Sequence, residues 1–328
     1  MMLSAIWLAG CGQGAAEQRL QDYQQRLAEA LDTASPSTAT PPNIGRFPER
    51  QARRFALPDI REGLTDIYAL RGCHISNLVA KRNNQLGRVA AASQRWLYEL
   101  ELWRRLQACQ DSSVVASLDD EDRRRLERLT RLKTQRLPRA SWNALFDSSE
   151  WVDSFSRASS PLPPSALSAV DTQLPALHYL RTAARHQLDP NWSTDSATLE
   201  GHLNTLRQRP LTAEILRALL LAEQRLEEAS GLIAQALESP QHCAETSREL
   251  PRMGKLADWL TRLDQQSTRW LTALHELLEA HPPTPPDAVV RYRHRWLSLD
   301  NPRAPLASMQ RAVAYHRDLR QHYVEQCR

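Results

Sequence analysis

The chain has 328 residues, with a hydrophobic content of 41% and nine tryptophans, which is enough to bury a sizeable core. Glycine is scarce and helix-forming residues are abundant, so we expect an all-α fold, a multi-helix bundle of long antiparallel helices. The net charge of +4 is small, and the basic residues, almost all arginine, are spread along the chain. Such a distribution argues against a nucleic-acid partner.

The N-terminus is a short apolar run that ends in the tetrapeptide LAGC, with Cys11 as its last residue. This pattern resembles the lipobox of bacterial lipoproteins, which implies that residues 1–11 are a lipoprotein signal and that Cys11 is lipidated. No Lys or Arg precedes Cys11, and signal peptides usually span about 15–30 residues, so we expect the true start codon to lie upstream. The alternative is an ordinary apolar N-terminus in which LAGC occurs by chance.

The residue after Cys11 is Gly12 rather than Asp, which by the sorting rule of that class favours the outer membrane. The run from Met1 to Gly10 is far shorter than the ~20 residues that a transmembrane helix needs. We therefore expect the protein to be held at the periplasmic face of the outer membrane by its lipid anchor alone.

Residues 12–49 divide into a helix and a linker. The helix is predicted by apolar residues at helical spacing: Leu20, Tyr23, Leu27 and Leu31. The stretch from Thr33 to Pro42 is rich in Ser, Thr and Pro, which predicts a flexible tether. Residues 50–328 are then an all-helical periplasmic domain, with a candidate internal boundary at residues 156–165, SRASSPLPPS.

The stretch from Leu64 to Cys109 predicts two packed helices. Apolar residues recur at helical spacing from Leu64 to Val79, Asn and Gly at 83–87 end that helix, and a second helix begins near Ser93. Arginines occupy the apolar stripe of the first helix, and a glutamate flanks that of the second. We therefore predict a buried polar cluster made of Arg71, Arg82 and Glu99, in which Arg82 and Glu99 form an ion pair.

This same stretch carries a family resemblance. The string CxxxxLVAxRNxxLGxVxxxSQxxLYExxxxxxLxxC, from Cys73 to Cys109, resembles an uncharacterised family of gammaproteobacterial lipoproteins catalogued only as domain of unknown function 3080. The resemblance extends over nearly the whole mature chain. It implies an envelope location and supplies no activity.

Four cysteines remain besides Cys11, and an even number in a periplasmic chain predicts two disulfides with three alternative connectivities. We expect the pairs Cys73–Cys109 and Cys243–Cys327. In a simple helical hairpin Cys109 lies further along the second helix than the point opposite Cys73, too far for a disulfide. The pair Cys73–Cys109 therefore requires the chain to turn back after the second helix. Buried free thiols are the alternative.

Several further helices follow in the sequence. We expect a charged, solvated helix over residues 119–135, for which contact with an anionic surface is a second interpretation, and then short turns over 141–155. Residues 289–299 alternate as in a strand, but the helical context favours a short helix. The other predicted helices cover residues 167–187 (interrupted at Pro175), 196–208, 212–238, 253–280 and about 306–327.

No recognisable catalytic, cofactor-binding or metal-binding motif is present in the sequence. The nearest approach is the segment HELLEAH, residues 275–281, in which Glu279 stands where a zinc protease needs His, and we interpret His275 and Glu279 as an exposed helical pair. The sequence thus favours a non-catalytic envelope lipoprotein that binds or scaffolds a protein or envelope polymer. The alternative is an envelope hydrolase, acting on peptidoglycan or lipid, with an unrecognised active site.

The lipidation hypothesis is tested by Cys11→Ala. Because the thiol of Cys11 is the expected attachment point of the lipid, this variant should be released into the soluble periplasm, whereas the wild-type protein should sediment with outer membranes. Cell fractionation measures the difference. Mass spectrometry that finds an unmodified segment from Met1 to Cys11, in protein made from the complete gene, would contradict the hypothesis.

Overall fold

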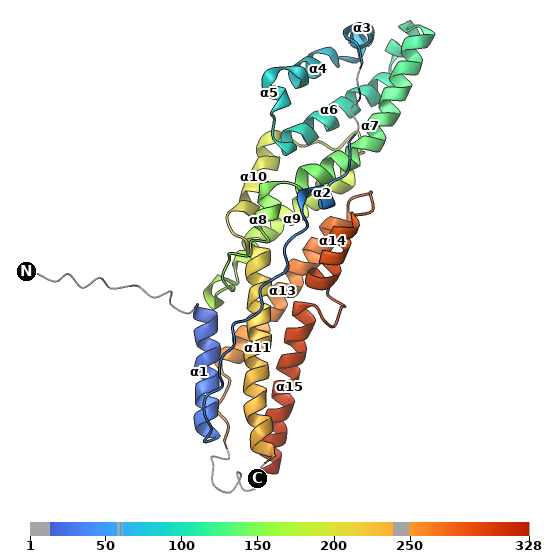
Figure 1. The fold of residues 1–328 in the computed structure, drawn as a ribbon. Coiled ribbons are helices and arrows are strands. Elements are labelled where there is room, and N and C mark those ends of the chain that lie inside the picture. The colour runs from blue at the N-terminus through green and yellow to red at the C-terminus, as the bar shows by residue number, and fades with distance from the viewer. Residues whose placement is uncertain (1–13, 58–59, 61, 239–248, 328) are drawn as a thin grey trace, which may run out of the picture.

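The computed structural model describes residues 14–57, 60, 62–238 and 249–327, and these residues form helices and no β-strand. The all-α prediction is therefore confirmed. The molecule is a long rod with a small group of helices at one end, which we call the head (residues 62–133), and a larger helical body below it (Figure 1). Two predicted sites, Cys11 and Cys243, lie outside the described residues.

The head begins with short helices and ends with two long ones. Its elements are α3 (Leu64–Ala69), the 3₁₀ turn η1 (Arg71–Cys73), α4 (Ser76–Asn83), α5 (Gln85–Arg88), α6 (Ala92–Gln110), the 3₁₀ turn η2 (Ser113–Ser117) and the first half of α7 (Asp120–Phe146).

The single helix predicted from Leu64 to Arg82 is wrong, because the chain breaks within it. His74 has φ of 57°, a left-handed conformation that ends η1 before α4 begins. Two residues of the predicted buried stripe, Leu64 and Tyr68, are instead 89% and 64% exposed. Periodicity alone therefore gave this segment the wrong length and the wrong environment.

The break in this helix explains the first disulfide. Cys73 lies in η1, which packs on the end of α6, so Cys73 meets Cys109 with a Cα–Cα distance of 5.1 Å. The predicted pair is present without the overshoot expected of a straight hairpin. Cys327 is also disulfide-bonded, and its predicted pairing with Cys243 stays a prediction that non-reducing peptide mapping checks.

Helix α7 is longer than the sequence indicated. It continues through Pro138 to Phe146, so the short turns predicted over residues 141–155 reduce to its last turn and α8 (Ser149–Asp153). Proline inside a helix removes one backbone hydrogen bond. Its cost is offset here because the turns around Pro138 are buried, and the following residues Trp142 and Phe146 belong to the main core.

The described part of the body combines long helices with short helices and turns. Its elements are α1 (Ala15–Ala30), α2 (Arg50–Arg53), α8, the 3₁₀ turn η3 (Pro164–Ala166), α9 (Ala169–His186), α10 (Ser196–Arg207), α11 (Leu211–Leu237), α13 (Lys255–Glu279), α14 (Asp287–Tyr292), the π-helical turn η4 (Arg293–Leu297) and α15 (Pro305–Gln326). The helix preference for residues 289–299 is confirmed, and α9 runs through Pro175 without interruption.

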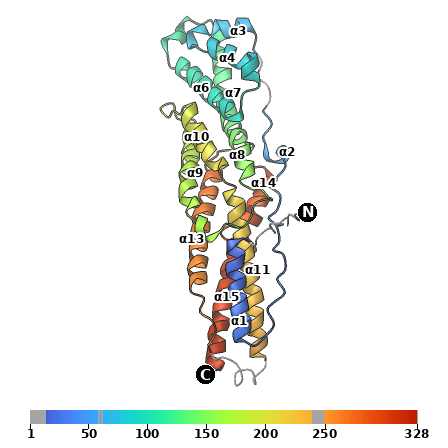
Figure 2. The ribbon, with the colours of Figure 1, turned by 90° about the vertical axis from the view of Figure 1, so that its left-hand side faces the viewer.

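Helix directions in the body are mixed rather than uniformly antiparallel. The most extensive helix contact joins α11 to α15, and the two run in the same direction, since Ser230 meets His316 and Glu223 meets Ser308. Helix α13 runs the opposite way along them (Figures 1 and 2). The predicted antiparallel arrangement therefore describes α13 against α11 and α15. It describes neither the main pair nor α13 against α9, which run the same way because Asp171 meets Arg269 and Arg181 meets Glu276.

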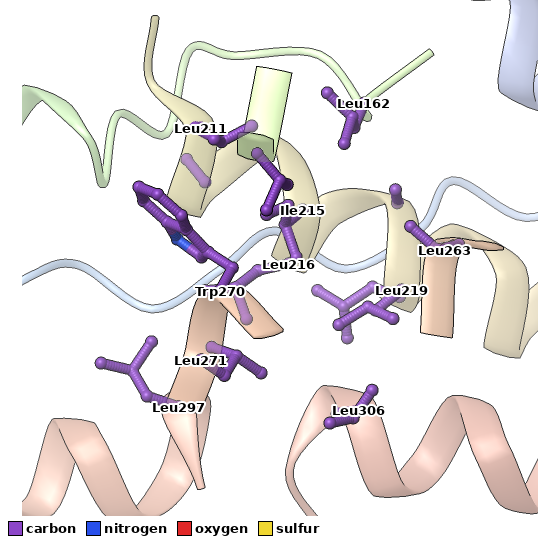
Figure 3. Close-up of a cluster of buried hydrophobic side chains, with 14 of the residues drawn as sticks. Leu162, Leu211, Ile215, Leu216, Leu219, Leu263, Trp270, Leu271, Leu297 and Leu306 are labelled. Atoms are coloured by element: carbon purple, nitrogen blue, oxygen red, sulfur yellow. The ribbon is translucent and has the colours of Figure 1, made fainter. Parts of the chain in front are cut away.

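The core of the body is continuous. Apolar side chains from α11, α13, η4 and α15 converge in one cluster, and Leu162 reaches the same cluster from the loop before η3 (Figure 3). The backbone N–H of Leu162 donates to the carbonyl of Glu214 at 2.9 Å. The candidate boundary at residues 156–165 is thus a loop tied to α11, with side chains of the same core on both sides of it.

The segment predicted as a flexible tether is packed against the body instead. It runs extended from the end of α1 to α2 along the rod (Figures 1 and 2). The carbonyl of Ala39 accepts hydrogen bonds from Gln224 and Arg225 of α11, and beyond it Ile44 and Phe47 are buried in the core. A Pro- and Thr-rich composition predicted its extended backbone correctly but missed these anchors.

The disulfide of the head is expected to stabilise the protein. Its cysteines are 36 residues apart in the sequence, and closing a loop of that length contributes about 3–4 kcal/mol by restricting the unfolded chain. The double variant Cys73→Ser/Cys109→Ser should therefore unfold at lower denaturant concentration and be cleaved faster in the head by a protease. Equal stability and equal protection of the head in both proteins would contradict this expectation.

Candidate ligand-binding site

Two neighbouring hollows, one at the junction of the head with the body and one in the head, are both lined by residues of α6 and α7. The first, the basic cleft, has a volume of about 420 Å³. The second, the aliphatic cavity, has a volume of about 340 Å³. The charged residues of the basic cleft are Arg50, Arg54, Arg82, Arg95, Arg136, Glu99 and Asp147. The aliphatic cavity is lined by Ile60, Ile67, Ile75, Val79, Leu102, Leu106 and Leu129, together with Glu62, Asn83, Tyr98 and Lys133.

Three arginines at one side of the basic cleft share a single carboxylate. Asp147 caps the C-terminal end of α7, and its side chain forms ion pairs with Arg50 at 3.0 Å, Arg53 at 2.8 Å and Arg54 at 3.2 Å. One carboxylate neutralises one guanidinium, so this group keeps an excess of positive charge. Helix α2 is therefore fixed to the end of α7 and adds to the basic character of the cleft.

Two further arginines of the cleft are bonded only to backbone oxygens. Arg82 Nη1 donates to the carbonyl of Gly87 at 2.7 Å, and Arg95 Nε donates to the carbonyl of Ala90 at 2.9 Å. Within the described part of the chain neither side chain forms an ion pair with a carboxylate. These two guanidinium groups hold the turn around α5 in place while their charges face the cleft.

The floor between the two hollows is a buried ion pair. Lys133 Nζ of α7 donates to Glu99 Oε2 of α6 at 2.8 Å, and Arg136 Nη2 lies 3.7 Å from Glu99 Oε1. Burial lowers the pKa of Lys133, and the charge of Glu99 opposes that shift. Glu99 and Arg136 face the basic cleft, whereas Lys133 faces the aliphatic cavity.

The predicted polar cluster of Arg71, Arg82 and Glu99 is therefore not assembled as expected. Glu99 is buried, as predicted, but its partner is Lys133 and not Arg82. Arg71 is exposed at the turn η1 and stacks on the ring of Tyr68. The error has a physical cause, since α6 packs chiefly on α7, whose first half had been assigned to solvent.

Comparison with known proteins identifies the family. The family described as "Protein of unknown function (DUF3080)" matches residues 20–328. The chain belongs to this family. No curated protein and no solved structure matches it. The matched region thus extends from the middle of α1 through the head to the end of the chain. The family has no assigned activity.

The segment HELLEAH, residues 275–281, which is the nearest approach to a zinc-protease motif, forms structural contacts. His275 bonds the carbonyl of Leu297, Glu276 pairs with Arg181, and Glu279 pairs with Arg293. His275 and Glu279 therefore each have another partner instead of forming the predicted helical pair, and His281 is buried against aromatic rings. Among the described residues there is no group of three or more His, Cys, Asp or Glu side chains placed to hold a metal ion.

A serine and a histidine do meet in the body, in a buried network. His316 bonds Ser230 at 3.0 Å through Nδ1 and Tyr23 at 2.6 Å through Nε2, and Arg320 donates to the same Tyr23 hydroxyl. Burial, aided by the charge of Arg320, lowers the pKa of His316 to about 4, so the imidazole is neutral at pH 7. Because Ser230 is only 2% exposed, we assign this network to joining α1, α11 and α15 rather than to chemistry.

Sequence reasoning missed most of the cleft. Lys133 carried a usable signal, because it follows Leu126 and Leu129 on the apolar stripe of α7, where a lysine needs a partner. No sequence signal marked the other cations of the cleft, namely Arg95, Arg136 and the arginines of α2. Arginines occur along the whole chain, and only the fold brings these particular ones together.

The buried pair predicts the result of a double-mutant cycle. Glu99→Gln leaves the ammonium group of Lys133 without its carboxylate in a poorly solvated position, which should lower the free energy of unfolding by about 3–5 kcal/mol. The double variant Glu99→Gln/Lys133→Met should lose less than the sum of the two single variants. Urea denaturation followed by circular dichroism measures each value.

Arg82→Ala is the matched control, because it removes a charge near the same pair but only one hydrogen bond, worth about 1 kcal/mol. If Arg82→Ala and Glu99→Gln were equally destabilising and coupled to each other, the Lys133 assignment would be wrong.

Proposed function

We propose that this protein is a non-catalytic lipoprotein of the outer membrane, facing the periplasm, that binds a phosphate-bearing envelope component in its basic cleft. The observation that carries the proposal is the pair Arg82 and Arg95, whose hydrogen bonds go to backbone carbonyls, beside three arginines that share Asp147. Guanidinium groups bind phosphate through paired N–H donors, and their charge attracts anions over about 10 Å at moderate salt.

The proposed anchoring rests on the LAGC pattern and on Gly12, and it is tested by the Cys11→Ala variant. Within the described residues no helix combines the length and apolar character needed to cross a membrane. Exposed apolar side chains support the head as the binding end: of six large ones that are exposed among the described residues, Leu64, Tyr68, Leu86 and Val89 lie there.

The experiment is co-sedimentation with lipid vesicles. The full chain carrying Cys11→Ser is used, so that a lipid anchor does not itself attach the protein to vesicles. Vesicles of phosphatidylethanolamine with phosphatidylglycerol should bind the protein, neutral phosphatidylcholine vesicles should bind it much less, and added salt should weaken the binding. Arg82→Gln/Arg95→Gln should weaken binding to the anionic vesicles roughly thirtyfold, from about 1 kcal/mol for each arginine.

The control is Arg185→Gln/Arg262→Gln, which removes the same charge from exposed positions on α9 and α13. If the control variant weakens binding as much as the cleft variant does, the cleft is not the site. Hydrolysis of the lipid or of peptidoglycan by the purified protein would favour the envelope hydrolase instead.

A further inference from the structure

The aliphatic cavity adjoins the basic cleft and differs from it in character. Its walls come from α3 and the segment before it, α4, α6 and α7, and among them Val79, Leu102 and Leu129 are aliphatic. Its volume of about 340 Å³ lies within the range of small-molecule sites, and seven of its eleven lining residues are aliphatic, the other four being Glu62, Asn83, Tyr98 and Lys133. A chain of methylene groups is the ligand that gains most from such walls, because each buried methylene adds favourable transfer from water.

Two polar residues of the cavity, Tyr98 and Lys133, lie beside residues that line the basic cleft, and we call this place the boundary. Tyr98 lines the cavity, and its ring has the guanidinium carbon of Arg82 and the Nζ of Lys133 each 5.9 Å from the ring centroid. Burial raises the pKa of the Tyr98 hydroxyl to about 12, and the charge of Glu99 acts in the same direction, so this hydroxyl stays a neutral hydrogen-bond donor.

The two carboxylates near this boundary are already neutralised. Glu62 lines the cavity and pairs with Arg128 at 2.9 Å, with Arg125 3.9 Å away. Glu99 is held by Lys133. The boundary is therefore a place where an anionic group meets the guanidinium group of Arg82 and the hydroxyl of Tyr98, beside aliphatic walls.

We propose that the aliphatic cavity holds the acyl chain of an anionic amphiphile whose head group is bound by Arg82 beside Tyr98. This inference rests on the proposed function, since it specifies the class of phosphate-bearing component that enters the cleft. The exposed residues Leu86 and Val89 follow Arg82 in the chain and provide an apolar surface over which the acyl chain passes from a lipid phase.

The test is a chain-length series in isothermal titration calorimetry. The full chain carrying Cys11→Ser is titrated with hexyl, octyl, decyl and dodecyl phosphate below their micelle-forming concentrations, and with inorganic phosphate and octanol as partial ligands. Affinity should rise by roughly fourfold for each added methylene until the cavity is filled, and then level off. Inorganic phosphate and octanol should each bind far more weakly than octyl phosphate, because each lacks one half of the ligand.

Two variants test separately how the acyl chain and the head group contribute to binding. Val79→Phe fills the cavity and should weaken binding of dodecyl phosphate at least tenfold while leaving binding to anionic vesicles through the cleft in place. Arg82→Gln should weaken binding of every alkyl phosphate by roughly tenfold or more without changing the chain-length slope. Val290→Phe on α14 and Arg262→Gln on α13 are the matched controls and should bind as the wild type does, with thermal melts confirming that all four variants are folded.

The outcomes distinguish this inference from the proposed function. Affinity that does not depend on chain length, or that is unchanged in Val79→Phe, overturns the acyl-chain assignment even where the protein binds anionic vesicles. Affinity that rises with chain length without levelling off, and equally in Val79→Phe, indicates adsorption to the surface and also overturns it. Loss of vesicle binding by the wild type overturns the proposed function itself.

Discussion

Helices α6 and α7 pack along most of their length, and each contributes to two hydrophobic cores. Trp96, Leu100 and Trp103 of α6 belong to the core of the body, whereas Leu102 and Leu106 belong to the small core of the head. The head has no other long helices, so its position on the rod depends on this pair. The ion pair of Glu99 and Lys133 lies within the same interface and fixes how the two helices meet, because a slip would strand two buried charges.

The head cannot be held by hydrophobic burial alone. Its core consists of few residues, and small cores supply little net stability once the entropy of ordering the chain is counted. The disulfide of Cys73 and Cys109, and the contacts of Arg125 and Arg128 with Glu62, supply what the small core lacks. Fixing the walls by covalent and ionic contacts leaves room between α4, α6 and α7, and this room is the aliphatic cavity.

The sequence predicted the fold class and most long helices, because apolar periodicity persists over many turns in α11, α13 and α15. Cysteine number and the expected compartment predicted two disulfides, and the pair Cys73–Cys109, chosen from three alternative connectivities, is present. The sequence did not predict where periodicity stops. His74 breaks the first helix of the head, and Pro138 does not break α7, because burial of the surrounding turns outweighs one lost hydrogen bond.

The candidate site was predicted less well than the fold, for a related reason. A helical wheel shows which residues share a face but not which helix covers that face. Glu99 was therefore recognised as a buried carboxylate and assigned to Arg82, when its partner came from α7. The tether was misread in the same way, since a composition rich in Pro and Thr gives the extended backbone of residues 33–42 but not its bonds to Arg225.

The charge distribution of the cleft separates a structural explanation from a functional one. Arg225 shows the structural arrangement in this protein, because it is buried and bonds both Glu17 and Glu228. In the basic cleft the balance is different: Arg50 and Arg54 share Asp147 with Arg53. Among the described residues, Arg82 and Arg95 form no ion pair with a carboxylate and hydrogen-bond to carbonyl oxygens. Like charges held close together repel each other, and a protein shaped by stability alone gains from a carboxylate at such a place. An unbalanced cluster beside an aliphatic cavity is therefore better explained by an anion that the cleft receives from outside than by the folding of the chain.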